Sequence, residues 1–289
     1  MRITLLASGG LGFTALKALH SQYAIAYVFT DRNSVDLRRY AEAEGLPVFV
    51  GNPRGGRAQA VLPAARCDVL LSVNYLFLIE ADLLAVASRY AINLHGSLLP
   101  KYRGRTPHVW AIINGEKETG VTAHLMTPEL DAGAVVGQRT LTIEPDTTGA
   151  DVLATYAKIY PALLAEVLDK ISENTLVPVP QDEGEATYFP KRTPDDGRIN
   201  WSWSRERVRN WIRAQAPPYP GAFFEFGGNR VTIHYARLSS RGFRHEQPDG
   251  TLLAVEGNEL EIKLADGALR IGPVADVTPF RSFIGKTLS

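Results

Sequence analysis

The sequence is poor in cysteine, has no long apolar run and carries no excess of charge of either sign. Cys67 is its single cysteine, so neither an internal disulfide framework nor a cysteine metal cluster can form. No stretch approaches the roughly 18 apolar residues of a membrane span. The apolar start of the chain meets Gly9 and Gly10 too early for the core of a signal peptide. We therefore expect a cytoplasmic protein that is not embedded in a membrane.

Positive and negative side chains balance, with 31 Lys and Arg against 31 Asp and Glu. This balance gives the whole molecule no attraction to nucleic acid or to an anionic membrane, although it is compatible with a local basic patch. A hydrophobic content of 45% and a charged content of 21% are ordinary for a globular protein. At 289 residues the chain is long enough for two domains.

Short apolar runs alternate with amphipathic stretches through the first half of the chain. This rhythm of strands and helices is typical of a parallel sheet with helices on both faces. Right-handed crossovers then give a doubly wound, Rossmann-like α/β fold with a mostly parallel sheet. The expected strands lie at residues 2–8, 23–30, 68–73, 90–94, 121–126 and 134–143. The expected helices lie at residues 12–20, 34–44, 57–65 and 80–88 and from about 148 to 171.

The pattern changes near residue 174. Residues 174–197 are rich in Pro, Glu, Thr and Asp, which indicates a linker. One short helix is expected at 204–213, followed by strands separated by turn residues. These features predict a smaller β-rich C-terminal domain, barrel-like or a sandwich, with the two domains at residues 1–187 and 188–289. The strand segments read AFFEF, RVTIHYARL, TLLAVEG, LEIKLA and ALRIG.

A glycine motif follows the first expected strand. GLGFTA at residues 10–15 matches the G-x-G-x-x-G/A dinucleotide-binding pattern, and Asp31 lies about 20 residues further on, where the ribose-binding acid of that pattern belongs. One interpretation is therefore an NAD-dependent oxidoreductase. Another is a tight strand-to-helix turn, which presents backbone N–H groups to any anion. If this loop binds a ligand, we expect Gly9, Gly10 and Gly12 to approach a phosphate of the substrate.

The chemically informative segment spans residues 91–138. Asn93 and His95 are two apart on an expected strand, so their side chains share a face at its C-terminal end, where ligands bind in open parallel sheets. Asp131 follows the next strand and precedes an Ala-Gly turn that lets its carboxylate approach the same edge. Between them lies an irregular loop whose polar residues are candidate substrate contacts: Lys101, Tyr102, Arg103 and Arg105.

Each of these residues also has a structural interpretation. A lone buried histidine usually makes hydrogen bonds within the core, and this describes His108 and His124 better than His95, which shares its strand face with Asn93. Asp131 is also good turn chemistry. The cations of the loop can form an ordinary solvated face.

Three motifs resemble the folate-dependent formyltransferase family. They read NLHGSLLPKYRG at 93–104, ETGVTAHLM at 118–126 and LDAGA at 130–134. The similarity continues through YFPKRTPDDGRINW at 188–201 and PPYPGA at 217–222, and so covers nearly the whole chain. It is closest to the sugar N-formyltransferases, among them the formyltransferase domain of the bifunctional aminoarabinose enzyme of lipid A modification. Methionyl-tRNA formyltransferase is more distantly similar.

The resemblance implies a reaction and a catalytic trio. The formyl group of 10-formyltetrahydrofolate, a co-substrate, would pass to an amine, with Asn93, His95 and Asp131 as catalytic residues and no metal. An imidazole suits removal of the amine proton near neutral pH, the Asn93 amide can stabilise an oxyanion, and Asp131 can orient the imidazole or hold a relaying water. The resemblance also places folate beside the strand at 68–73, where relatives often have a basic or polar residue in the loop that follows. In this chain the loop residues are Asn74, Tyr75, Leu76 and Phe77.

The expected acceptor is the amine of a nucleotide-linked amino sugar, which would place the enzyme in lipopolysaccharide biosynthesis. Relatives that act on tRNA usually have a basic insertion after the second strand, whereas residues 30–45 are short and charge-balanced here. Residues 190–289 carry 15 Lys and Arg against 11 Asp and Glu, a mild excess for a surface that must track phosphates. We therefore expect no nucleic-acid partner, while a homodimer is compatible with the family. The alternatives are a methionyl-tRNA formyltransferase, an NAD-dependent oxidoreductase and a catalytically silent binding module.

Overall fold

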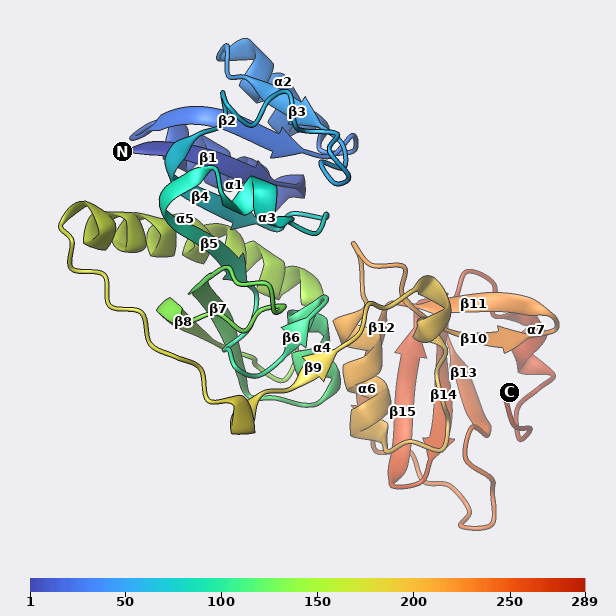
Figure 1. Ribbon diagram of the computed structural model, residues 1–289. Coiled ribbons are helices and arrows are strands. Elements are labelled where there is room, and N and C mark those ends of the chain that lie inside the picture. The colour runs from blue at the N-terminus through green and yellow to red at the C-terminus, as the bar shows by residue number, and fades with distance from the viewer. Residues whose placement is uncertain (289) are drawn as a thin grey trace. The chain divides into compact units, whose positions relative to one another are not determined.

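Seven strands form one sheet in the computed structural model, which describes residues 1–288 (Figure 1). The strand order is β3-β2-β1-β4-β5-β7-β8, with parallel pairs from β3 through β5 and an antiparallel pair between β5 and β7. This topology confirms the predicted doubly wound, mostly parallel α/β sheet. The strands are β1 (Arg2–Ala7), β2 (Ala24–Thr30), β3 (Val48–Val50), β4 (Cys67–Val73), β5 (Ala87–His95), β7 (Glu118–Leu125) and β8 (Val135–Thr142).

Two helices, α1 (Gly9–His20) and α5 (Gly149–Ser172), pack on this sheet. At Gly12 of α1, an added Cβ would lie 2.9 Å from the Cβ of Ala7, so glycine allows the helix to sit close to β1. An added Cβ at Gly137 of β8 would likewise lie 2.9 Å from Leu163 of α5. A further helix, α2 (Val35–Ala43), packs on α1. The buried stripe of α5 repeats every three or four residues and consists of Val152, Tyr156, Tyr160, Leu163, Leu164, Val167, Leu168 and Ile171.

Apart from the α5 stripe, an apolar cluster contains Leu6 and Leu70 of the sheet together with residues of the segments that precede β4 and β5. Two predicted helices are wrong in this region. Residues 54–65 form successive turns, in which Pro63 cannot supply the N–H that a helix requires. The helix expected at 80–88 is only α3 (Ala81–Leu84), because the residues from Ala87 onward extend β5.

The chain divides into two compact units, and the division does not follow a single boundary. The first unit comprises Met1–Gly104, Thr119–Leu141 and Leu153–Phe189, and the second comprises Arg105–Glu118, Thr142–Val152 and the segment from Pro190 onward. The change of unit at Phe189 lies next to the boundary expected at residues 187 and 188. The sequence pattern does not predict the two earlier segments, of which the first contains α4 (Pro107–Ile113), a helix packed on α6 (Arg205–Ala214).

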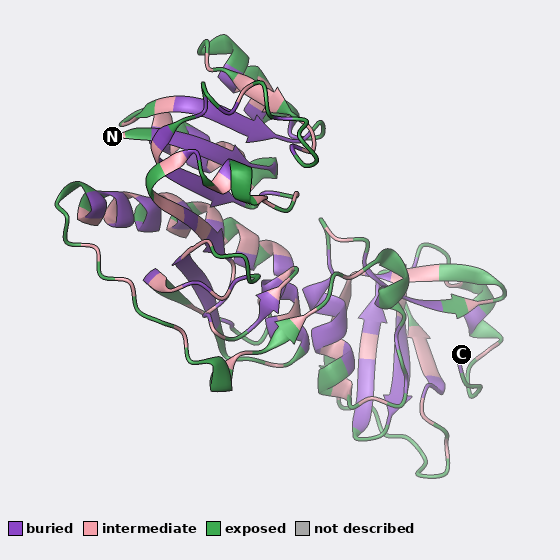
Figure 2. Cartoon of the chain, in the orientation of Figure 1, coloured by how far each residue is buried: buried purple, intermediate pink, exposed green. Residues whose placement is uncertain are grey.

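The second unit is rich in strands, as predicted, and the neighbouring strands of its sheets are antiparallel. A four-stranded sheet has the order β12-β15-β14-β13, and β10 and β11 form a separate pair. The segment RVTIHYARL divides at His234 into two strands of different sheets. α6 packs on β12 and β15, and Figure 2 shows the buried residues of this region in purple. The elements are β10 (Ala222–Phe226), β11 (Asn229–Ile233), β12 (Tyr235–Ser239), β13 (Leu252–Glu256), β14 (Glu259–Leu264), β15 (Gly267–Gly272) and α7 (Thr278–Arg281).

The connection between α5 and the second unit is ordered and contains short elements. Two 3₁₀ helices, η1 (Glu183–Glu185) and η2 (Pro194–Gly197), flank the strand β9 (Tyr188–Phe189). β9 pairs in parallel with β6 (Arg103–Gly104) within the first unit. Across residues 1–288, none of the helices combines the length and apolarity needed to cross a membrane.

Candidate active site

Asn93 and His95 occupy the C-terminal end of β5, which lies between β4 and β7 in the sheet. Asn93 is the register partner of His124 on β7, and His95 is the partner of Thr122. Asp131 follows β7 in the turn that leads to β8. The structure therefore brings the three residues predicted as a trio together at one edge of the sheet.

The imidazole of His95 is held by a backbone carbonyl on one side and faces a carboxylate on the other. Its Nε2–H donates to Tyr102 O at 2.8 Å, and its Nδ1 lies 3.6 Å from Asp131 Oδ2. Only 6% of His95 is exposed. Because the carbonyl requires a proton on Nε2, Nδ1 is the atom at which the ring can accept another proton. A proton accepted there would lie beside the Asp131 carboxylate.

The turn at Asp131 is shaped so that its carboxylate lies over the end of β5. Asp131 has a left-handed backbone with φ 56°, a conformation that Asp adopts more readily than most residues. Its Oδ2 accepts a hydrogen bond from Gly104 N at 3.0 Å. Gly133 brings the turn against β7, since an added Cβ would lie 1.8 Å from Leu125 O. Glycine is therefore required in the third position of the Asp-Ala-Gly turn.

His124 contacts the amide of Asn93. From the sequence alone, this histidine was interpreted as structural. Its Nδ1–H donates to Leu125 O at 2.9 Å, so its Nε2 accepts a hydrogen bond from Asn93 Nδ2 at 3.1 Å. Nε2 also lies 3.7 Å from Asp131 Oδ1. Burial lowers the pKa of His124 to about 4, even though the charge of Asp131 acts in the opposite direction. His124 is therefore neutral at physiological pH. Its role depends on the pairing of Asn93 with His124 across β5 and β7, which the sequence alone does not show.

Hydrogen bonds fasten the loop after β5 to the neighbouring strands. Thr122 of β7 donates to Ser97 O at 2.7 Å and accepts from Leu99 N at 3.1 Å. Gln138 of β8 donates to Thr122 Oγ1 at 2.8 Å and to Leu99 O at 3.1 Å. Ser97 in turn donates to Lys101 O at 2.7 Å. The irregular loop is thus a fixed part of the site.

The loop residues expected to contact substrate differ in exposure. Lys101 and Arg105 are exposed. Tyr102 is buried and stacks on Phe189, with ring centroids 4.7 Å apart. Arg103 is 0% exposed and has all five N–H groups engaged by Gln181, Glu183 and Tyr188. Contrary to the expectation from sequence, Arg103 has no N–H left for a substrate.

Side chains of the loop after β4 point alternately into the core and toward solvent. Tyr75 belongs to the apolar cluster around Leu70, and Phe77 packs against the same cluster. Leu76 is 48% exposed and Leu78 is 52% exposed. Asn74 donates from Nδ2 to Ser8 O at 3.1 Å. Tyr75 and the partly buried Phe77 therefore pack on the core beneath the loop, and their contact with folate stays a prediction. Leu78 presents an apolar surface that the sequence did not single out.

The glycine turn after β1 is closed by its own hydrogen bonds. Gly9 N donates to Ser34 Oγ at 2.8 Å, and Ser34 Oγ donates to Asp31 Oδ2 at 2.5 Å. Asp31 Oδ1 accepts from Asn33 N at 2.8 Å. Burial acts to raise the pKa of Asp31, but these hydrogen bonds outweigh it and leave the pKa lowered. Asp31 is 5% exposed, so it folds this loop and does not present a carboxylate to a ribose. Gly10 is exposed, whereas Gly12 packs on Ala7.

Within residues 1–288, no three His, Cys, Asp or Glu side chains are grouped as a metal site would require. The chemistry readable at the edge of the sheet is that of proton transfer and hydrogen bonding.

Comparison with known proteins identifies the fold and the family. Residues 1–168 match the family model described as formyl transferase, and residues 191–276 match the model of the formyl transferase C-terminal domain. The first model alone spans more than half of the chain. The chain therefore belongs to the formyl transferase family, which confirms the resemblance carried by the sequence motifs and sets aside the NAD-dependent oxidoreductase.

Solved structures share this fold over nearly their whole length. WlaRD, a sugar 3N-formyltransferase crystallised with dTDP and 5-N-formyl-THF, has a TM-score of 0.74 and 18% identity, covering 96% of this chain and 98% of that chain. An N-formyltransferase from Helicobacter canadensis, in complex with folinic acid and dTDP-3-aminofucose, has a TM-score of 0.72 and 18% identity, with coverage of 94% and 98%. Methionyl-tRNA formyltransferase from Clostridium thermocellum has a TM-score of 0.60 and 17% identity, with coverage of 92% and 100%. At these identities the likeness concerns the fold.

Proposed function

We propose that the protein transfers a formyl group from 10-formyltetrahydrofolate to the amine of a nucleotide-linked amino sugar. The observation that carries the proposal is the convergence of an amide, an imidazole and a carboxylate, from Asn93, His95 and Asp131, at the C-terminal edge of a formyltransferase sheet. Ligands of open parallel sheets bind at this edge. The two sugar enzymes of the same fold, crystallised with formylated folates and dTDP compounds, support the choice of both substrates.

In the proposed reaction, His95 Nδ1 accepts the proton of the acceptor amine as its nitrogen bonds to the formyl carbon supplied by the folate. The conjugate imidazolium then faces Asp131 Oδ2, which lies 3.6 Å from Nδ1 and stabilises the charge. An N–H of the Asn93 amide donates to the formyl oxygen as negative charge develops there. As the bond from the formyl carbon to folate N10 breaks, the proton passes from His95 to that nitrogen.

Exposed leucines at the same edge fit the apolar faces of the pterin ring of the folate. Leu76 and Leu78 follow β4, whose last residue, Val73, pairs with Leu94 of β5 between Asn93 and His95. Leu130, which precedes Asp131, is 55% exposed. Leu76 and Leu78 lie two residues apart in one loop and both face solvent, and neighbouring exposed apolar side chains are typical of a binding surface. We assign Leu76 and Leu78 to the folate side of the site, and Lys101 and Gly10 to the acceptor side.

A methionyl-tRNA formyltransferase is the competing function within the family. The segment between β2 and β3, where tRNA relatives usually carry a basic insertion, holds only the short helix α2. This supports a small acceptor. A cytoplasmic location, a homodimer and a role in lipopolysaccharide biosynthesis are further elements of the proposal.

The acceptor can be identified by offering the enzyme 10-formyltetrahydrofolate with dTDP- and UDP-linked amino sugars, and in parallel with charged initiator methionyl-tRNA. We expect a product 28 mass units heavier, as a formyl group replaces one hydrogen, from at least one nucleotide sugar and none from the tRNA. Formylation of the tRNA alone would overturn the sugar assignment, and tight NADH binding without folate binding would overturn the reaction class.

A further inference from the structure

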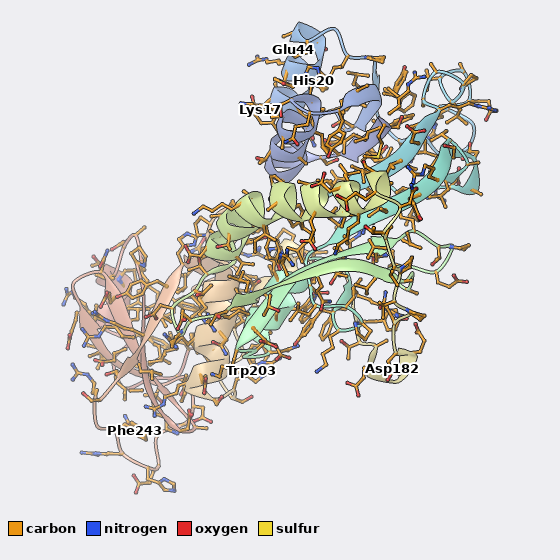
Figure 3. All side chains as sticks on the ribbon, turned by 90° about the vertical axis from the view of Figure 1, so that its left-hand side faces the viewer. Lys17, His20, Glu44, Asp182, Trp203 and Phe243 are labelled. Carbon is orange, nitrogen blue, oxygen red and sulfur yellow. The ribbon has the colours of Figure 1, made fainter. Side chains whose placement is uncertain are left out.

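The segment between the two matched family models contacts the candidate catalytic turn. The models match residues 1–168 and 191–276, so residues 169–190 lie in neither. Within this stretch, residues 181–189, here called the connecting segment, contain η1 and β9 and belong to the first unit. Asp182 lies on the exposed side of the segment (Figure 3), whereas several of its neighbours point toward Arg103 and Asp131.

Arg103 binds three side chains of the connecting segment. Its Nη2 and Nη1 donate to Glu183 Oε1 and Oε2 at 2.6 and 2.9 Å, and Nη1 also donates to Tyr188 OH at 2.5 Å. Nη2 and Nε donate to Gln181 Oε1 at 2.8 and 3.3 Å. These five bonds use every N–H of the guanidinium. The planar fork of Arg103 therefore fixes the direction of the Gln181 amide.

Gln181 passes this constraint to the turn that carries the carboxylate. Its Nε2 donates to Asp131 O at 2.8 Å and to Gly133 O at 2.7 Å. Both N–H groups of the amide are thus used on the Asp-Ala-Gly turn, and its oxygen is used on Arg103. A side chain with no donor at this position would take this hydrogen bond away from both carbonyls.

The connecting segment also binds the backbone of residues 102–104, which in turn contacts His95 and Asp131. Thr187 accepts from Tyr102 N through its side chain and from Arg103 N through its carbonyl, both at 2.8 Å. At Gly104 (φ 103°), an added Cβ would lie 2.2 Å from Phe189 O. The adjoining atoms are Tyr102 O, which accepts from His95, and Gly104 N, which donates to Asp131. The backbone partners of His95 and Asp131 thus lie on Tyr102 and Gly104, two of the three consecutive residues that this segment holds.

Stability alone does not explain this arrangement well. The guanidinium of Arg103 is buried and loses its hydration, whereas the Glu183 side chain that pairs with it is 64% exposed, so the ion pair offsets much of that cost without adding a large net stabilisation. What such a network provides is a defined geometry, and reacting groups need positions accurate to a fraction of an ångström.

We propose that the connecting segment is a positioning element of the active site, in which Gln181, held by Arg103, sets the position of Asp131 relative to His95. This proposal rests on the proposed transfer chemistry at Asn93, His95 and Asp131. Residues 181–189, whose composition indicates a linker in the sequence, would then influence catalysis.

The sharpest test is Gln181→Glu, which keeps the shape of the side chain and its acceptor for Arg103 but removes both donors to the turn. We expect kcat to fall by about 10- to 100-fold, with the KM values of folate and acceptor changed by less than about threefold. Glu183→Gln, which weakens the hold on Arg103, should give a smaller fall in kcat. Glu185→Gln removes a charge from the same 3₁₀ helix at an exposed position and should leave kcat unchanged.

A lowered melting temperature with unchanged kcat in Gln181→Glu would overturn the proposal, as would equal effects of Glu183→Gln and Glu185→Gln. If Gln181→Glu does not fold, the comparison of the two glutamate variants decides. NMR of the His95 imidazole provides a readout independent of turnover, since the Nε2–H signal should shift or broaden in Gln181→Glu. If the wild-type enzyme formylates no acceptor while the His95 signal still changes in Gln181→Glu, the proposed function fails and the positioning role stands. If the wild type formylates a sugar and the signal does not change in Gln181→Glu, the positioning role fails and the proposed function stands.

Discussion

The amide nitrogen of Asn93 lies 3.1 Å from Nε2 of His124, across the antiparallel pair of β5 and β7. Because His124 Nδ1–H donates to Leu125 O, Nε2 offers a lone pair and can be met only by an N–H. His124 therefore determines which end of the Asn93 amide is nitrogen. The second N–H of that amide, which we assign to the developing oxyanion, gains its direction from the same contact.

Replacing His124 should impair catalysis through Asn93. His124→Leu removes the acceptor, so the amide of Asn93 can rotate, and we expect kcat to fall by at least about tenfold with little change in KM. His124→Gln offers an amide oxygen in nearly the same place and should retain most of the activity. In an Asn93→Ala background, His124→Leu should cost little more. Steady-state kinetics of the four combinations measure this coupling, and fully additive losses would contradict it.

The pKa of His124 also predicts how stability varies with pH. In the unfolded chain this histidine has the ordinary pKa of about 6.5, whereas burial lowers it to about 4 in the fold. Between these values the unfolded state binds more protons, so stability is complete above about pH 6.5 and is lost as the pH falls toward 4. The loss due to this group is on the order of 3 kcal/mol. Denaturant unfolding between pH 4 and 7 measures it, and His124→Gln should show a shallower slope than the wild type.

The sequence predicted the parts of the site that follow from local periodicity. Strand alternation placed Asn93 and His95 on one face, and the Asp-Ala-Gly turn returned Asp131 to the same edge. Both predictions depend on neighbours close in the chain. The glycine turn after β1 was also predicted, but its pattern does not show that Ser34 occupies the Asp31 carboxylate, because that depends on how the next loop folds.

Contacts between distant segments account for what the sequence could not indicate. From the sequence alone, Arg103 is a cation in a loop. Only the fold shows that Glu183, eighty residues further on, accepts its hydrogen bonds. The resemblance implied that Tyr75 and Phe77 contact the ligand. Nothing local in the sequence shows that the loop after β4 is extended, with side chains that point alternately into the core and toward solvent. The apolar spacing of residues 57–65 predicts a helix, yet the turns there bury Ala58 and Leu62 in the same cluster.

Replacing His95 should separate transfer from folate binding. His95→Asn removes the proton acceptor at Nδ1, and we expect turnover to fall by about 10²- to 10⁴-fold, the range associated with general base catalysis. Binding of 5-formyltetrahydrofolate, measured by calorimetry, should change by less than about threefold, because the exposed leucines of the folate side are unaltered. His245→Asn, at an exposed position of the second unit, is the matched control. Wild-type turnover in His95→Asn would disprove the assignment of the base.

The alternation in the loop after β4 predicts opposite outcomes for adjacent residues. Leu78→Ser replaces a half-exposed apolar side chain, so the KM of folate should rise by about 3- to 30-fold while kcat and the melting temperature change little. Phe77→Ser should instead lower the melting temperature, because Phe77 packs against Tyr75 with ring centroids 5.5 Å apart. Val177→Ser, at a position 75% exposed outside this loop, controls for the loss of surface apolarity. If Leu78→Ser left the KM of folate unchanged, the folate would have to lie elsewhere along the edge of the sheet, and the catalytic groups would have to be assigned around that position.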